Sequence, residues 1–115
     1  MKNGQNLVIL EGTVCFDLDK GTTQKGTPWL RGVIENVREF DKAGGEKGKE
    51  TNRIRFVMFG KSCDPFAAVV AKDTPVSLTG ALRVENTESG NGGNPQYQVT
   101  VNVWRFQVLK ETAAN

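Results

Sequence analysis

The sequence predicts an all-β fold: a small, closed, five-stranded Greek-key barrel with one short helix between the third and fourth strands. The chain has 115 residues, of which 37% are hydrophobic, a size and composition that suit one domain with one core. Its thirteen glycines divide it into short segments separated by turns. Apolar and polar residues alternate with the period of a β-strand, most regularly between Val76 and Val84.

The first two predicted strands carry glycine or irregular alternation where the chain would bend. The first strand covers residues 7–16, and Gly12 within it is typical of a bulge or a barrel corner. Residues 17–27 are polar and rich in turn formers, so we expect a loop there. The second strand covers residues 29–40, and its imperfect alternation suits a long strand with both faces partly covered. The charged, glycine-rich residues 41–50 then predict a hairpin loop.

The third predicted strand, residues 52–61, has two faces of different chemistry. Ile54, Phe56 and Met58 make a core face. The other face carries Arg53, Arg55, Val57, Phe59 and Lys61. Because like charges on neighbouring positions repel each other, this row indicates that an anion binds there, and the ring offers a surface on which a base can stack. The alternative interpretation pairs the arginines with acids across the sheet and turns Phe59 into the core.

A short helix follows the third strand. Ser62 or Asp64 can cap it, and Pro65 suits its first turn. The apolar residues within 66–71 make it a short apolar helix, and Lys72-Asp73-Thr74-Pro75 ends it.

Two strands complete the predicted domain. The fourth covers residues 76–84 and the fifth residues 96–109, with a long flexible loop over residues 85–95. We expect one domain over residues 1–110, followed by a short polar tail over residues 111–115. Three strands, a short helix and two strands are the element order of the OB-fold, which binds oligonucleotides across its second and third strands and its loops.

The distribution of charge supports this location for a binding surface. The whole chain has a net charge of only +2. Residues 20–61 hold ten basic and five acidic residues, so the positive field lies on this third of the chain.

Three stretches of the chain resemble the bacterial and phage-type single-stranded DNA-binding proteins. They are residues 8–14 (Val-Ile-Leu-Glu-Gly-Thr-Val), residues 55–61 (Arg-Phe-Val-Met-Phe-Gly-Lys) and residues 76–83 (Val-Ser-Leu-Thr-Gly-Ala-Leu-Arg). The middle stretch is the most specific of the three, and the resemblance extends over residues 7–103. It implies an OB-fold that binds single-stranded DNA.

The resemblance also implies roles for particular residues. Phe40 and Phe59 fall on stacking positions of the family, and its cationic positions correspond to Arg55, Lys61 and Arg83. Two further positions where the family commonly has tryptophan hold Arg53, whose guanidinium can stack or contact phosphate, and Thr87, which offers no stacking surface. The acidic C-terminal tail of the family, which recruits partner proteins, has no counterpart in residues 111–115.

Other candidate binding residues have two interpretations each. Trp29 could stack on a base or cover the barrel end. The hairpin lysines Lys42, Lys47 and Lys49 could close on phosphates or simply be solvated. We include Arg31 with this basic set. For Trp104 and Phe106 we favour packing or a subunit interface.

The residue inventory argues against catalysis and against bound cofactors or metals. The chain contains no histidine, which excludes Ser-His-Asp and Cys-His arrangements. Its two cysteines, Cys15 and Cys63, are too few for a disulfide scaffold or a cysteine zinc site. With no signal peptide and no apolar run long enough to span a membrane, we expect a cytoplasmic protein.

These observations predict sequence-nonspecific binding of single-stranded DNA in replication, recombination or repair, with RNA as an alternative ligand. We expect a homodimer or homotetramer, because the apolar first strand would pair at its edge, and replication proteins are candidate partners. The alternative function is a dimeric OB-fold adaptor of a primosome-like assembly with weak nucleic-acid binding.

Overall fold

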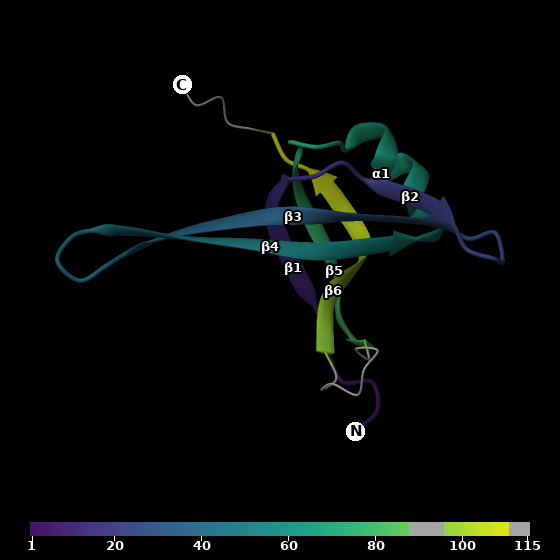
Figure 1. The fold of residues 1–115 in the computed structure, drawn as a ribbon, viewed down its shortest axis with the longest axis horizontal. Coiled ribbons are helices and arrows are strands. Elements are labelled where there is room, and N and C mark those ends of the chain that lie inside the picture. Colours follow the sequence, from purple (N-terminus) through teal and green to yellow (C-terminus); the bar gives the residue numbers. More distant parts are fainter. Residues whose placement is uncertain (88–95, 111–115) are drawn as a thin grey trace.

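The computed structural model describes residues 1–87 and 96–110 and shows a β-barrel from which two long hairpins project (Figure 1). Its elements are, in chain order, β1 (Val8–Val14), β2 (Asp19–Thr22), β3 (Pro28–Asp41), β4 (Lys47–Phe59), the 3-10 helix η1 (Gly60–Ser62), α1 (Cys63–Val69), β5 (Pro75–Thr87) and β6 (Gln96–Val108). The predicted five strands and the helix between the third and fourth of them are all present.

Five strands close the barrel in the order β1-β5-β6-β4-β3, and β1 returns to β3. The closure uses two register pairs, Thr13 with Glu35 and Val14 with Ile34. Gly12 precedes this crossing, and a Cβ atom there would lie 2.2 Å from the carbonyl oxygen of Glu35, so only glycine lets the two backbones approach. The β4–β6 pairing is parallel and the others are antiparallel. This is the topology of the OB-fold, as the sequence predicted.

The expectation of a loop throughout residues 17–27 is wrong, because Asp19–Thr22 forms β2. This strand pairs with the start of β3 and adds a sixth strand outside the barrel. The sequence of β2, Asp-Lys-Gly-Thr, has no alternating apolar residues that would identify it as a strand. Two cross-strand contacts hold it in place. The indole of Trp29 packs against Gly21, and Arg31 forms an ion pair with Asp19.

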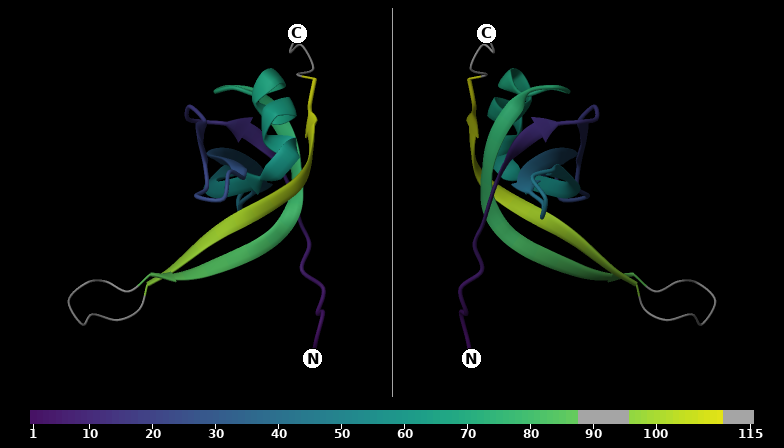
Figure 2. Two further views of the ribbon diagram at one scale, coloured as in Figure 1. Left: turned by 90° about the vertical axis from the view of Figure 1, so that its right-hand side faces the viewer. Right: turned by 90° about the vertical axis from the view of Figure 1, so that its left-hand side faces the viewer.

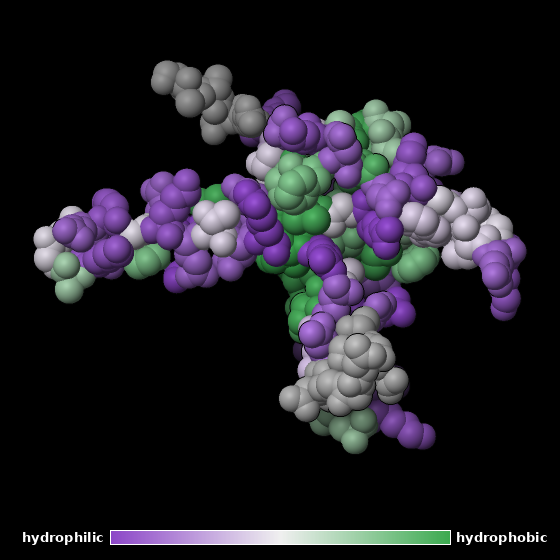
Figure 3. All heavy atoms as spheres, viewed as in Figure 1, coloured by the Kyte–Doolittle hydropathy of each residue, from purple (hydrophilic) through white to green (hydrophobic). Residues whose placement is uncertain are grey.

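The β3–β4 hairpin is longer than the sequence predicted. Its register runs from Trp29 opposite Phe59 to Asp41 opposite Lys47, so the turn covers only residues 42–46. The expected loop over residues 41–50 is therefore wrong at both ends. The turn uses Gly44 and Gly45 at φ of 89° and 85°, which favour glycine. Figure 3 shows hydrophilic residues over most of this projecting arm.

The β5–β6 hairpin projects in a different direction (Figure 2). Its strands reach Thr87 and start again at Gln96, so the predicted loop over residues 85–95 is shortened at its first end. Residues 88–95 and the predicted polar tail, residues 111–115, lie outside the described residues.

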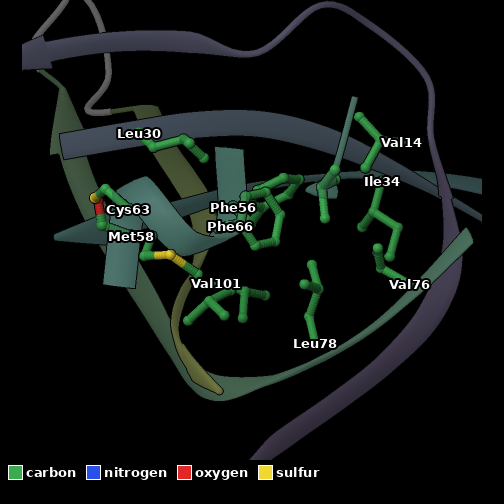
Figure 4. Packing of buried hydrophobic residues seen from close by; sticks show 12 residues of the cluster. Val14, Leu30, Ile34, Phe56, Met58, Cys63, Phe66, Val76, Leu78 and Val101 are labelled. Carbon is green, nitrogen blue, oxygen red and sulfur yellow. The ribbon is translucent and has the colours of Figure 1, made fainter. Parts of the chain in front are cut away.

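One hydrophobic core fills the barrel, and α1 covers its end (Figure 4). The ring of Phe66 on α1 makes edge contacts with Phe56, at a centroid distance of 5.8 Å, and with Phe106, at 4.8 Å. Phe106 points inward because a bulge opposite Thr79 and Gly80 shifts the phase of β6. The same bulge leaves Trp104 outside, 52% exposed.

Both cysteines are free thiols. Cys63 at the start of α1 is buried and donates to the carbonyl oxygen of Met58, and its burial raises the pKa of the thiol above the usual value, with Asp64 adding to the shift. Cys15 is half-buried and donates to the carbonyl oxygen of Val33. The only helices in residues 1–87 and 96–110 are too short to cross a membrane.

Candidate nucleic-acid interface

A cleft of about 650 Å³ lies on the outer face of the sheet. Its walls come from the segment before β2 and from strands β2, β3, β4, β5 and β6. It is lined by four aromatic residues and three arginines, together with acidic and neutral residues. The aromatic residues are Phe16, Trp29, Phe59 and the buried Phe56, and the arginines are Arg31, Arg55 and Arg83.

The alternation of β4 directs its cationic and aromatic residues into this cleft. Phe56 and Met58 are fully buried, so the residues that alternate with them, Arg55, Val57 and Phe59, point outward. Arg55 and Phe59 line the cleft, and the ring of Phe59 is 43% exposed. The alternative that Phe59 turns into the core is therefore wrong, and its ring is open to a flat ligand.

Five of the eleven predicted binding residues are brought together here. Four of them lie on β3 and β4, and the fifth lies on β5, across β6 from them. They are Trp29, Arg31, Arg55, Phe59 and Arg83.

Trp29 combines the two interpretations that the sequence left open. Its indole is half-buried because it packs against Gly21, where a Cβ atom would lie 2.4 Å from Cζ2 of the ring. It nevertheless lines the cleft, and the guanidinium of Arg31 lies over it, 5.1 Å from the ring centroid.

Phe40 and the predicted hairpin lysines lie on the projecting β3–β4 arm and do not line the cleft. Phe40 pairs with Gly48, its ring fills the space above that glycine, and Arg38 lies over the ring. In the two-residue alternation of β3, Phe40 falls on the same side of the strand as the buried Leu30 and Ile34, whereas Trp29 falls on the opposite side. The structure thus separates Phe40 from Phe59.

The three lysines occupy different positions on this arm. Lys42 is in the turn, whereas Lys47 and Lys49 belong to β4. Lys47 forms an ion pair with Asp41 at 2.7 Å, as expected for a solvated hairpin tip.

Arg53 and Lys61 flank the cleft. Arg53 forms an ion pair with Glu35 at 3.3 Å, as the alternative interpretation of the basic face proposed, and lies 5.8 Å from the centroid of Phe16. It also lines a second hollow, of about 350 Å³, next to Arg55 and Tyr97. Lys61 is exposed on η1, immediately after β4.

Ion pairs distinguish the arginines of the cleft. Arg31 is held by Asp19 at 2.7 Å, and Arg83 lies 3.5 Å from Glu85. Within the described part of the chain, Arg55 has no acidic partner. Its guanidinium is therefore the one most available to an anion.

On the arm, Glu50 accepts hydrogen bonds from Asn52 and Arg38. These contacts lower the pKa of Glu50, with the Asn52 bond as the larger cause. Because the folded-state pKa is depressed, the contribution of these contacts to stability is present at neutral pH and is lost as acid protonates Glu50.

Sequence reasoning missed several residues that line the two hollows. Phe16 follows β1 and was assigned only to a strand, although it is 50% exposed. Tyr97, 68% exposed, and Gln98 come from β6. Tyr97 has the same phase on β6 as the buried Val101 and Val103, so alternation alone predicts an inward ring, but the residue lies far out on the projecting hairpin. No group of three potential metal ligands occurs among residues 1–87 and 96–110.

Comparison with known proteins agrees with the fold. The model of the single-strand binding protein family matches residues 5–109. The chain belongs to this family. Among solved structures, it is similar to a Plasmodium falciparum SSB in complex with ssDNA, with a TM-score of 0.86 and 15% identity over 96% of this chain and 99% of that one.

A second similar structure is a small single-stranded DNA-binding protein from Streptomyces coelicolor. The TM-score is 0.70, with 14% identity over 89% of this chain and 92% of that one. At these identities the likeness concerns the fold, and the family match identifies the chain as an SSB-family protein.

The exposure of Phe59 leads to a prediction about stability. Phe59→Ala should lower the free energy of unfolding by less than about 1 kcal/mol, because the ring lies at the surface. The matched control, Phe56→Ala on the same strand, removes a fully buried ring and should cost about 3–5 kcal/mol. Urea unfolding followed by circular dichroism measures both. A loss for Phe59→Ala as large as that for Phe56→Ala would show that Phe59 supports the core.

Proposed function

We propose that this SSB-family protein binds single-stranded DNA without sequence specificity, and that the cleft on β3 and β4 is its binding site. The observation that carries the proposal is that one cleft is lined by Trp29, by the exposed ring of Phe59 and by Arg55, which has no acidic partner among the described residues. Aromatic rings beside cations suit unpaired bases joined by phosphates. The solved complex of the similar Plasmodium falciparum SSB with ssDNA supports the same ligand.

In this mechanism bases stack on exposed rings and phosphates contact cations. Phe59 provides a stacking surface within the cleft, and Arg55 provides the phosphate contact. Arg31, Arg53, Lys61 and Arg83 surround them. The arm extends the basic surface through Lys42, Lys47 and Lys49, and Phe40 can contribute a ring once Arg38 moves aside. A single RNA strand also has unpaired bases that can stack and phosphates that can contact cations, so RNA is the alternative ligand.

The process served by such binding is DNA replication, recombination or repair, where single strands must be protected and presented. Replication proteins are the expected partners. The rival proposal, an adaptor with weak nucleic-acid binding, is favoured by the many ion pairs that neutralise the arm and the cleft.

Selectivity for single strands tests the proposed function. A duplex hides the base faces that Phe59 and Trp29 would contact, so oligo(dT) should bind at least ~10-fold more tightly than duplex DNA of the same length at moderate salt. Fluorescence anisotropy with labelled oligonucleotides measures both affinities, and oligo(U) added to the series tests RNA. Equal affinity for single strand and duplex would leave only a generic basic surface and contradict the stacking mechanism.

Arg55 and Phe59 should affect binding in different ways. Arg55→Ala removes a phosphate contact, so binding should weaken and the slope of log K against log salt should become shallower by about 0.7. Phe59→Ala should cost about 1–3 kcal/mol of binding free energy and leave that slope unchanged. Arg105→Ala is the charge-matched control, because Arg105 is exposed on β6 but does not line the cleft. Equal losses for Arg55→Ala and Arg105→Ala would contradict the assignment of Arg55.

We further propose a homodimer or homotetramer assembled through β1. Residues 8–13 of β1 pair with β5, but the opposite edge pairs with β3 only at Thr13 and Val14. Leu7 and Ile9 are 55% and 63% exposed. Trp104 on the nearby β6 is also exposed. An open strand edge next to exposed apolar side chains favours pairing with a second copy.

Light scattering at micromolar concentration tests this assembly, and the expected mass is that of two or four chains. Ile9→Lys should reduce the mass, because a buried charge at the contact is costly. The matched control is Val69→Lys, which places the same charge at an exposed apolar residue on α1. A monomeric wild-type protein would contradict the proposal.

A further inference from the structure

The cleft carries as many carboxylates as guanidinium groups. Its three arginines are matched by Asp17, Asp19 and Glu85, so the lining has no net formal charge. This balance is unexpected for a surface that binds a polyanion, because single-strand binding depends on cations facing phosphates. The carboxylates of the cleft therefore need an explanation of their own.

Asp19 occupies the donors of Arg31 that a phosphate would use. Its Oδ2 atom accepts two hydrogen bonds, from Nε at 3.0 Å and from Nη2 at 2.7 Å. The two residues face each other directly in the β2–β3 register. A phosphate oxygen is recognised by the same planar guanidinium donors. Both side chains are more than half exposed, so the pair is weak and water can reach it.

The same ion pair fixes Arg31 above the indole. The guanidinium carbon lies over the ring of Trp29, 5.1 Å from its centroid, while Gly21 packs against the indole from β2. As long as Asp19 holds Arg31, the guanidinium covers the ring on which a base would stack. One carboxylate thus restricts both a phosphate contact and a stacking surface.

We propose that Asp19 is an intramolecular competitor for the phosphate-binding position on Arg31, and that it thereby sets the affinity of this cleft for single-stranded nucleic acid. The inference rests on the proposed function. When a strand enters, a phosphate oxygen replaces Oδ2 of Asp19 on the same N–H groups, and Arg31 moves with the phosphate and uncovers Trp29. Asp19 is a positioning residue, because it acts through Arg31. Arg55 needs no such exchange and makes the first phosphate contact.

The test compares Asp19→Asn with Asp17→Asn in titrations of labelled oligo(dT) over a series of salt concentrations. Asp19→Asn should bind about two- to fivefold more tightly than wild type, the range expected when one exposed ion pair no longer competes. The affinity of Asp19→Asn should also fall more steeply with salt. In wild type, the carboxylate of Asp19 is freed when the strand binds and takes up a cation, which reduces the net release of counterions. The variant has no carboxylate at this position, so its net release is larger. Asp17→Asn removes the same charge from the same cleft, but Asp17 has no ion pair among the described residues, so its gain should be smaller.

Two further variants separate competition from a structural role. Asp19→Glu keeps a carboxylate and should stay close to wild-type affinity. In an Arg31→Gln background, Asp19→Asn should gain no more than Asp17→Asn does, because no guanidinium is left to release. Thermal unfolding checks that each variant is folded.

The outcomes distinguish this inference from the proposed function. If wild type does not bind oligo(dT) even at low salt, the proposed function fails. If wild type binds but Asp19→Asn gains no more than Asp17→Asn, or if its gain persists without Arg31, the role of Asp19 is refuted and the proposed function stands. A folded Asp19→Asn variant that binds more weakly than wild type also refutes it.

Discussion

The face of this protein that carries the cleft depends on the two-residue period of β4 where that strand crosses the barrel. Phe56 and Met58 must enter the core, because the barrel is closed by neighbouring strands on both sides and covered by α1 at its end. Once they are fixed, the backbone has no freedom to bury Arg55 or Phe59, which alternate with them. The outward direction of these two side chains is therefore a consequence of core packing.

Much of the fold could be predicted from the sequence because it depends on this local pattern. The core residues of β4 and β5 and the position of the helix follow from alternation and from turn residues. β2 could not be predicted in this way, because Asp19–Thr22 has no apolar face and is held by Trp29 and Arg31 on another strand. The extension of β4 back to Lys47 was missed for a related reason: a run of charges looks like a loop until its cross-strand partners are known.

The residues that line the cleft could be predicted where they lie on β4 and less well elsewhere. The outward position of Phe59 follows directly from the alternation of its own strand, whereas the resemblance that made Phe40 a stacking residue gave no information on which side of β3 its ring lies. In the structure Phe40 lies far along the arm, packed against Gly48 and covered by Arg38. Phe16 was missed because its exposure depends on how the chain leaves the barrel after β1, which no pattern within the sequence encodes.

One arrangement occurs at both ends of β3. Near its start, Trp29 packs against Gly21 and lies under Arg31, which pairs with Asp19. Near its end, Phe40 packs against Gly48 and lies under Arg38, which pairs with Glu50. In each case a ring covers the glycine directly opposite on the neighbouring strand, and the arginine two residues nearer the middle of β3 pairs with the acid opposite itself. Such contacts stabilise strands that bury little apolar surface. Because the two sets have opposite phases on β3, only the first opens into the cleft, so the same local contacts line the cleft at one end and support the arm at the other.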